Sequence, residues 1–348
     1  MNYYHSTFIS GFQEIIVNAL KNTLPDVEIK EILDGLVIYK TSSDVKTIQK
    51  LKFLNNSFVL LSHIINRKSS KKQNLEIIVQ NLLKRSNFDG IKSITKLRYI
   101  KYFRVMVSKE NETRSIKPSV LEQVEKKISR ELRLKIHRSN PDIEFWFLAR
   151  KEGSLLFGAR ITPLGKQKTR KYEKGELRRE LAHLLVLMSD PSKDDVVLEP
   201  FAGSGAIVLE RVQSFLYKKI YASDTDLDLA GELKRKTKWG QQKIVVLSEN
   251  AFTLPSISDN SIDKIITDPP WGEFGPPLPS QVAPFNQEML KSFDRVLKSN
   301  GVAVILLSRN IDFDSVVKNS AFQISKRVNI LVSGKKATVY KLAKKKNT

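Results

Sequence analysis

Residues 196–207 read VVLEPFAGSGAI, a short apolar run followed by a glycine-rich turn. Ligands of open α/β sheets bind at the carboxyl ends of the strands, where Gly203 and Gly205 let the backbone approach closely. A dinucleotide-binding turn has a third glycine where this chain has Val208, so pyrophosphate is not the expected ligand. The helix start suits one carboxylate, such as that of a methionyl group, and Glu199 can pair with its ammonium. A tight packing turn is the alternative interpretation of the glycines.

The sequence around this turn alternates between short apolar runs and amphipathic helices from Glu176 onwards. Such alternation is typical of a parallel sheet covered by helices on both faces. Two later runs, FQISKRVNILV and ATVYKLA, predict an antiparallel hairpin at the edge of that sheet. We therefore predict an α/β fold for residues 176–348, with a Rossmann-like sheet of seven mostly parallel strands.

Polar residues follow the next two predicted strands. Asp224 ends the run KIYASD, where an acid can accept both ribose hydroxyl hydrogens of an adenosine. Asp226 and Asp228 compete for that role, although a helix cap is the simpler interpretation of Asp226. The run KIVVLS leads to Asn250 and Ala251, where the Asn250 side chain can hydrogen-bond an adenine edge. These positions predict the adenosine half of a cofactor site.

A second motif, IITDPPWG at residues 265–272, ends a further predicted strand. Pro269 and Pro270 remove two backbone donors and hold the flanking groups rigidly. An exocyclic base amine is a weak nucleophile because its lone pair is delocalised into the ring. The Asp268 carboxylate and the Pro269 carbonyl can accept its hydrogens and localise that lone pair, and Trp271 can stack on the base. A proline turn beside a core tryptophan is the alternative.

Positive charge is concentrated in one part of the chain. The net charge of +22 divides into −1 over residues 1–50, +18 over 51–180, −3 over 181–300 and +8 over 301–348. A solvated surface is the simple explanation, but the excess in the middle segment is larger than solubility requires. We therefore predict a surface there that binds the phosphates of a nucleic acid.

Composition excludes several kinds of protein. The absence of cysteine rules out disulfides, thiolate zinc sites and a cysteine nucleophile, and the four histidines lack ligand spacing, so no structural metal is expected. No apolar run approaches the roughly eighteen residues that span a bilayer. The amino terminus lacks the pattern of a secretory signal, so we expect a cytoplasmic protein without a membrane partner.

The chain is long enough for more than one domain. Helix and hairpin patterns over residues 1–65 and basic helix and strand patterns over residues 66–165 each predict an α+β domain. Turn formers and dense positive charge without periodicity predict a linker at residues 166–175.

The order EPFAGSG followed by DPPWG resembles the amino-methyltransferases, in which a glycine-rich motif precedes D/N-P-P-Y/F/W. More narrowly, the chain is similar to the THUMP-containing RNA methyltransferases that form N2-methylguanosine in tRNA or ribosomal RNA. The resemblance implies a ferredoxin-like domain, a THUMP RNA-binding domain, a linker and a Rossmann-like methyltransferase domain over the four ranges above. It implies S-adenosyl-L-methionine as cofactor, bound by Glu199, Phe201, Ala202, Gly203, Ser204, Gly205, Asp224, Asn250, Ala251 and Asp268. It implies catalysis by Asp268, Pro269, Pro270 and Trp271.

The chain departs from the family pattern in two places. Where D-P-F-C-G-S-G is common, it has Glu199 in place of the aspartate and Ala202 in place of the cysteine. Where tyrosine or phenylalanine commonly ends the second motif, it has Trp271. The charge and the stacking face are kept, so activity is expected. A DNA adenine-N6 or cytosine-N4 methyltransferase would use the same motif, but the 62 residues between Gly205 and Asp268 leave no room for a DNA-reading insertion.

A protein glutamine methyltransferase would not need the basic segment. A non-catalytic RNA-binding protein would not need intact site acids. The sequence thus predicts methylation of guanine N2 in RNA, with tRNA as the expected substrate.

Overall fold

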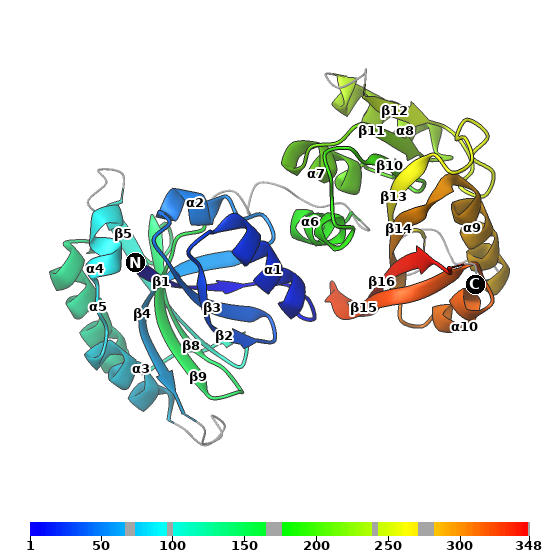
Figure 1. Ribbon diagram of the computed structural model, residues 1–348. Coiled ribbons are helices and arrows are strands. Elements are labelled where there is room, and N and C mark those ends of the chain that lie inside the picture. The colour runs from blue at the N-terminus through cyan, green and yellow to red at the C-terminus, as the bar shows by residue number, and fades with distance from the viewer. Residues whose placement is uncertain (67–73, 96–99, 165–175, 239–242, 271–281, 347–348) are drawn as a thin grey trace. The chain divides into compact units, whose positions relative to one another are not determined.

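The computed structural model describes residues 1–66, 74–95, 100–164, 176–238, 243–270 and 282–346. The chain forms two compact units, the first made of residues 1–8 and 16–171 and the second of residues 9–15 and 172–348. Each unit is built around its own β-sheet (Figure 1). The predicted linker lies outside the described residues.

The first unit contains a nine-stranded sheet in the order β2-β3-β1-β4-β9-β8-β5-β6, with β7 paired to β5. Its strands are β1 (Asn2–Thr7), β2 (Glu28–Leu33), β3 (Leu36–Thr41), β4 (Asn56–Ile65), β5 (Tyr102–Lys109), β6 (Glu112–Thr113), β7 (Lys135–Ile136), β8 (Ile143–Ala149) and β9 (Ser154–Arg160). Antiparallel pairing of β4 with β9 joins the strands before residue 66 to those after residue 100. One sheet therefore runs through both segments predicted as separate domains, and the boundary at residue 65 stays a prediction.

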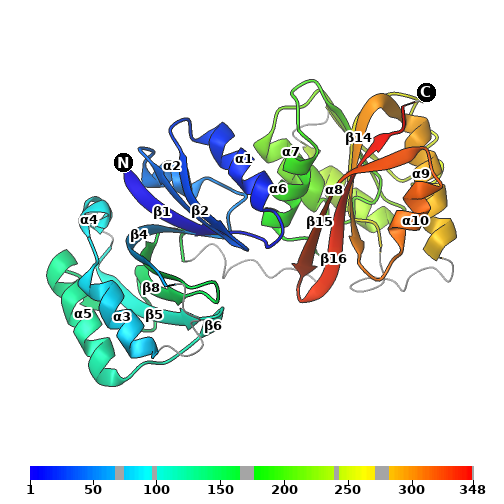
Figure 2. The ribbon, with the colours of Figure 1, turned by 60° about the horizontal axis from the view of Figure 1, so that its bottom comes forward.

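Helices cover this first sheet. They are α1 (Gln13–Thr23), α2 (Val45–Gln49), α3 (Leu75–Lys84), α4 (Asp89–Thr95) and α5 (Pro118–Leu132). Helix α3 begins where the Asn74 side chain accepts a hydrogen bond from the Glu76 amide, and α5 begins at Pro118, whose fixed φ suits a first helical turn. Figure 2 shows α3, α4 and α5 gathered on one side of the β4–β5 part of the sheet. Their buried aliphatic side chains close the core of this unit.

The second unit contains a seven-stranded sheet in the order β12-β11-β10-β13-β14-β16-β15. Its strands are β10 (Val196–Glu199), β11 (Lys219–Ser223), β12 (Ile244–Leu247), β13 (Ile262–Thr267), β14 (Leu297–Ser308), β15 (Phe322–Val332) and β16 (Lys335–Lys344). The first five strands in this order run parallel, and the β15–β16 hairpin joins them antiparallel through β16. The structure thus confirms the predicted Rossmann-like sheet and its closing hairpin.

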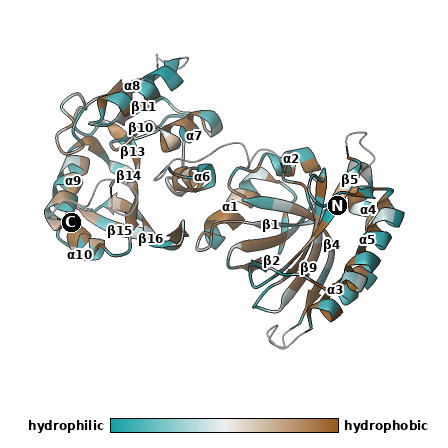
Figure 3. Cartoon of the chain, turned by 180° about the vertical axis from the view of Figure 1, so that it is seen from behind, coloured by the Kyte–Doolittle hydropathy of each residue, from teal (hydrophilic) through white to brown (hydrophobic). Residues whose placement is uncertain are grey.

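Helices flank both faces of this sheet. They are α6 (Arg179–Met188), α7 (Ala206–Ser214), α8 (Leu227–Lys236), α9 (Val282–Val296) and α10 (Phe313–Lys318). Helices α6 and α7 lie on one face and α9 and α10 on the other (Figures 1 and 2). The buried Glu210 carboxylate binds both His183 Nδ1 and Arg179 Nε at 2.8 Å, which fastens α7 to α6. Brown, apolar residues run along the strands, whereas the helices carry both teal and brown residues (Figure 3).

The helices that the structure describes include none with the length and apolar character needed to cross a bilayer.

Candidate active site at the carboxyl ends of the parallel strands

Three acidic side chains lie at the carboxyl ends of parallel strands in the second sheet. Glu199 is the last residue of β10, Asp224 follows the end of β11, and Asp268 follows the end of β13. Strand β10 lies between β11 and β13, and all three run parallel. The three acids that the sequence singled out are therefore brought to the same edge, where open α/β sheets bind their ligands.

The glycine turn after β10 contains two glycines with different surroundings. Both have positive φ angles, +49° at Gly203 and +84° at Gly205, which favour glycine. A Cβ added to Gly205 would lie 2.3 Å from Leu233 Cδ1 of α8, whereas one added to Gly203 would have no described atom within 4 Å. Gly205 thus allows α7 to begin against α8, and Gly203 leaves space open beside the turn.

Asp224 holds this turn in place. Its Oδ2 accepts a hydrogen bond from the Gly203 amide at 2.7 Å, and its Oδ1 accepts one from the Asp226 amide at 2.9 Å. Each carboxylate oxygen can accept two hydrogen bonds, so each still has capacity for a ribose hydroxyl. The Ala202 amide adds a hydrogen bond to the Ser223 carbonyl at 2.9 Å. The ends of β10 and β11 are therefore joined through backbone amides.

Asp226 has the simpler of the two roles that the sequence left open. Its side chain accepts hydrogen bonds from the amides of Asp228 and Leu229, at 2.9 and 3.1 Å, and caps α8. This capping leaves Asp224 as the acid that faces the glycine turn.

The end of β12 is tied to β11 by Ser223, a fully buried residue that sequence reasoning missed. Its Oγ donates to the Glu249 carbonyl at 2.9 Å and accepts from the Glu249 amide at 3.1 Å. The exposed Asn250 side chain accepts from the Phe252 amide at 2.8 Å, which leaves its own NH₂ group as a donor toward a ligand. Ala251 is buried beside it.

Glu199 is the most deeply buried acid of the group, with 2% of its surface exposed. Its Oε1 accepts from Thr267 Oγ1 at 2.6 Å and from the Phe201 amide at 3.2 Å. Its Oε2 is buried and has no hydrogen-bond partner among the described residues. Burial raises the pKa of the Glu199 carboxyl well above its usual range, and the nearby charges of Asp268 and Asp224 raise this pKa further. The carboxyl therefore keeps its proton to a higher pH than an exposed glutamate does.

The Asp-Pro-Pro segment leaves β13 directly after the buried Thr267. Asp268 and Pro270 are half-buried and Pro269 is buried. Trp271, predicted to stack on the substrate base, lies outside the described residues, so that role stays a prediction.

An aromatic cluster lies beside these motifs, and of its three rings the sequence predicted only Phe201 as a site residue. The Phe285 ring of α9 lies 5.9 Å from the Phe201 ring and 5.0 Å from the Phe252 ring, measured between centroids. Phe201 belongs to the glycine turn and Phe252 to the turn after β12, and all three rings are half-buried. Phe252 directly follows the predicted Asn250 and Ala251, which was the one available signal.

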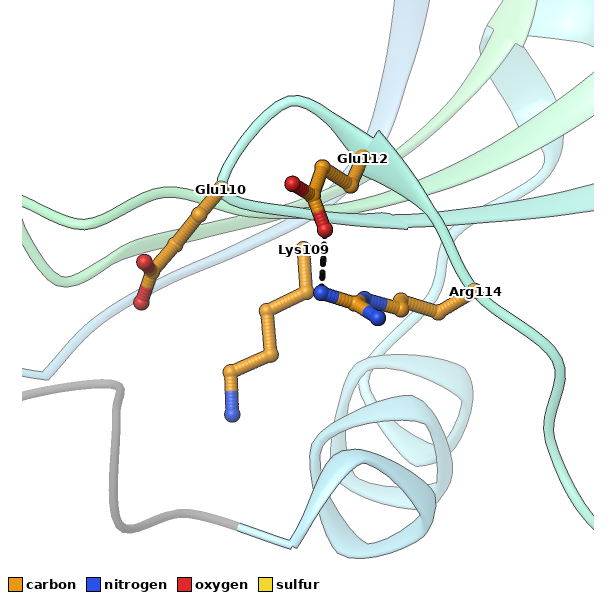
Figure 4. Close-up of a pocket in the computed structure, with 4 residues that line it drawn as sticks. All are labelled: Lys109, Glu110, Glu112 and Arg114. Carbon is orange, nitrogen blue, oxygen red and sulfur yellow. Dashed lines mark hydrogen bonds and ion pairs between the residues drawn. The ribbon is translucent and has the colours of Figure 1, made fainter.

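A hollow in the first unit is unlike this site. It is lined by Lys109, Glu110, Glu112 and Arg114 at the β5–β6 hairpin, where Glu112 and Arg114 form an ion pair (Figure 4). Its two acidic and two basic side chains cancel, so the hollow has no net charge to attract an anion or a cation. Across the described part of the chain, no group of three or more His, Asp or Glu side chains is arranged to hold a metal ion.

We expect Glu199→Gln to stabilise the cofactor-free protein at neutral and alkaline pH. Above the usual glutamate pKa near 4.5 the unfolded chain releases a proton that buried Glu199 keeps, so wild-type stability falls as pH rises through that interval. Glutamine has no such proton. The variant should gain roughly 1–3 kcal/mol of unfolding free energy at about pH 8, with the difference vanishing toward low pH.

Urea unfolding of both proteins across a pH series measures this difference. Glu288→Gln, at an exposed position on α9, is the matched control and should show no such trend. A Glu199→Gln difference that stayed constant with pH would contradict a raised pKa of the buried Glu199 carboxyl.

Comparisons with known proteins agree with this geometry. Residues 167–338 match the model of the RMKL-like methyltransferase domain. The probable tRNA (guanine(10)-N2)-dimethyltransferase of Methanothermococcus thermolithotrophicus is 30% identical over 142 residues, which cover 39% of this chain and 83% of that protein. The tRNA (guanine(6)-N2)-methyltransferase of Thermus thermophilus is 30% identical over 176 residues, or 49% of this chain and 51% of that protein, so the match spans about half of this relative.

A solved structure extends the likeness in fold to the whole chain. TrmN from Thermus thermophilus superposes with a TM-score of 0.76 at 19% identity, covering 99% of this chain and 100% of that one. The sheet, its glycine turn and the matching domain model define a methyltransferase domain. The chain belongs to the RMKL-like methyltransferase domain family.

Proposed function

We propose that this enzyme transfers a methyl group from S-adenosyl-L-methionine to the N2 amine of a guanine in RNA, with tRNA as the substrate. The observation that carries the proposal is the placement of the Asp-Pro-Pro segment beside Glu199 and the glycine turn, on the neighbouring strand. The two relatives described above support the choice of guanine N2 in tRNA, because both are named for that reaction.

The residues at the strand ends fit the cofactor. Among the described residues, Glu199 Oε2 is buried without a partner and can accept from the methionyl ammonium, and no described atom fills the space where a Cβ of residue 203 would lie. Asp224 retains acceptor capacity for the ribose hydroxyls, and the Asn250 amide donates toward the adenine edge. Bound there, S-adenosyl-L-methionine supplies an electrophilic methyl group on its sulfonium. Phe201, Ala202, Ser204, Gly205 and Ala251 shape the surrounding backbone.

Asp268 orients the nucleophile. Its carboxylate and the Pro269 carbonyl accept the two hydrogens of the guanine amine and direct the nitrogen lone pair toward the methyl group. As the N–C bond formed, the bond from the methyl carbon to the sulfonium sulfur would break, and the neutral thioether of S-adenosylhomocysteine would be the leaving group. The nitrogen would then carry the positive charge, and its proton would leave toward Asp268. Pro269 and Pro270 keep this acceptor pair rigid, so little reorganisation is needed during transfer.

The target base must leave its helix to reach Asp268, which costs a few kcal/mol. Stacking on an aromatic side chain returns about 1–3 kcal/mol and does not depend on the identity of the base. Trp271 is the proposed stacking residue, and the half-buried rings of Phe252 and Phe285 add apolar surface at the same edge. The stack therefore holds the base without selecting it, and Asp268 selects a base that carries an exocyclic amine.

The first unit is proposed to dock the RNA, as a ferredoxin-like domain over residues 1–65 and a THUMP domain over 66–165. The described part of the +18 segment presents exposed cations from α3, α5 and the nearby strand ends: Lys84, Arg85, Lys101, Lys126, Arg130, Arg133 and Lys135. Phosphate contacts of this kind fix position and orientation but carry no sequence information. Docking and chemistry are therefore assigned to different units.

We expect RNA affinity to fall steeply with salt and to depend on these cations. Each phosphate contact adds roughly 0.9 to the slope of log affinity against log salt. Replacing Lys101, Arg133 and Lys135 by alanine should flatten that slope by about 2 to 3 and weaken binding at least about tenfold at moderate salt. Filter binding of labelled tRNA over a salt series measures both quantities.

The matched control replaces three exposed lysines of the second unit, Lys193, Lys234 and Lys243. It removes the same charge and should change affinity much less. An equal loss in both triple variants would show that net charge alone, and not the first unit, controls docking.

Whether RNA rather than DNA is the substrate is tested with methyl-labelled S-adenosyl-L-methionine and equal amounts of total RNA and genomic DNA. Label should enter RNA and be absent from DNA. Labelling of DNA would favour the adenine-N6 or cytosine-N4 alternative, and binding of RNA without labelling would favour a non-catalytic RNA-binding protein.

A further inference from the structure

Thr267 occupies a junction between the two halves of the proposed site. It is the last residue of β13, it is fully buried, and it directly precedes Asp268. Its Oγ1 donates a hydrogen bond of 2.6 Å to Glu199 Oε1, at the end of the adjacent strand β10. One side-chain hydrogen bond therefore connects the strand that carries the glycine turn to the strand that carries the Asp-Pro-Pro segment.

This hydrogen bond also fixes the orientation of the Glu199 carboxyl. Oε1 is occupied by Thr267 and by the Phe201 amide, so Oε2 is the oxygen left over. Oε2 is buried without a partner among the described residues, and two acidic groups, Asp268 and Asp224, act on the Glu199 carboxyl. A buried carboxylate is stabilised by a cationic donor. A cationic donor would therefore complete this arrangement, and the ammonium of a methionyl group is one.

We propose that Thr267 is a positioning residue that holds Glu199 with Oε2 turned toward the ammonium of the bound cofactor. Because Thr267 directly precedes Asp268, it also holds Glu199, which binds the cofactor, at a fixed distance from Asp268, which accepts the hydrogens of the base amine. This inference rests on the proposed function, which places the methionyl group at the glycine turn. Thr267 itself touches neither the cofactor nor the base.

Two substitutions test the role. Thr267→Val keeps nearly the same shape but lacks the hydroxyl, whereas Thr267→Ser keeps the hydroxyl. A hydrogen bond to a charged group supports affinity by a factor of about ten or more, so Thr267→Val should bind S-adenosylhomocysteine about tenfold more weakly and Thr267→Ser nearly as wild type. Calorimetry measures both affinities, and thermal unfolding checks that both variants fold.

A second ligand separates positioning from general damage. 5′-Methylthioadenosine contains the adenosine part of the cofactor but no ammonium or carboxylate, so its affinity should be the same in wild type and in Thr267→Val. Loss of the hydroxyl donor also disfavours the ionised Glu199, so the pH at which S-adenosylhomocysteine binding becomes strong should move upward in Thr267→Val.

Three results would overturn the inference. They are unchanged S-adenosylhomocysteine affinity in Thr267→Val, an equal loss for 5′-methylthioadenosine, and failure of serine to restore binding. Failure of the proposed function looks different, because then wild-type protein would itself bind no S-adenosylhomocysteine.

Discussion

Replacing Asp268 by alanine should lower the turnover of methyl transfer roughly 100-fold or more while the affinity for S-adenosyl-L-methionine stays nearly unchanged. The two effects separate because Asp268 follows β13, whereas Glu199 ends β10 and Asp224 follows β11. The proposed partner of Asp268 is the base amine, so its loss removes an interaction made during the reaction rather than during cofactor binding. Single-turnover rates at saturating cofactor and RNA measure the chemical step directly.

Two control variants sharpen this prediction. Asp268→Asn keeps one acceptor oxygen for the amine and should retain clearly more activity than Asp268→Ala. Asp194→Ala removes an exposed acid that precedes β10 at the opposite edge of the sheet and should behave as wild type. Near wild-type transfer by Asp268→Ala would show that the Asp-Pro-Pro segment is only a structural turn.

Replacing Asp224 by alanine should weaken cofactor binding about a hundredfold to ten-thousandfold. Two charge-assisted hydrogen bonds to ribose are lost, each worth about 1.5–3 kcal/mol. The amides of Gly203 and Asp226 also lose their acceptor, so the glycine turn becomes less ordered. Both consequences act in the same direction, and calorimetry with S-adenosylhomocysteine measures their sum.

Asp226 offers a matched control two residues away. Asp226→Ala removes the cap of α8 and should cost about 1 kcal/mol of stability, with a much smaller effect on cofactor affinity. If Asp224→Ala kept its affinity, Asp224 would not belong to the site. If both variants lost affinity equally, the loss would reflect disorder at the start of α8.

The second sheet was predictable because its signals are local. Parallel strands buried on both faces are continuous apolar runs, and each of them except β12 is followed by a helix with its own period. In the first unit, β1 and β4 were not predicted. Two residues of β1, His5 and Ser6, are buried polar groups that face partners far away in the chain: His5 stacks on Phe58 of β4, and Ser6 hydrogen-bonds Tyr39 and Ser57. Contacts at that separation leave no local pattern.

The candidate site likewise contains residues that local sequence predicts and residues that it does not. Acids that end apolar runs are visible in a sequence, so Glu199, Asp224 and Asp268 can be predicted without knowing which strands are neighbours. The bond from Thr267 to Glu199 and the contacts of Phe285 depend on which strands and helices become neighbours. Strand order is decided by packing of the whole sheet, so these partners could not be predicted.

The identity of the methylated nucleoside tests the central claim most directly. Purified protein is incubated with labelled S-adenosyl-L-methionine and tRNA, the RNA is digested to nucleosides, and the labelled product is identified by mass spectrometry. We predict N2-methylguanosine or its dimethyl form in wild type, and roughly 100-fold less of either after the same incubation with Asp268→Ala. Label in N6-methyladenosine or N4-methylcytidine, or no labelled nucleoside with wild type, would contradict it.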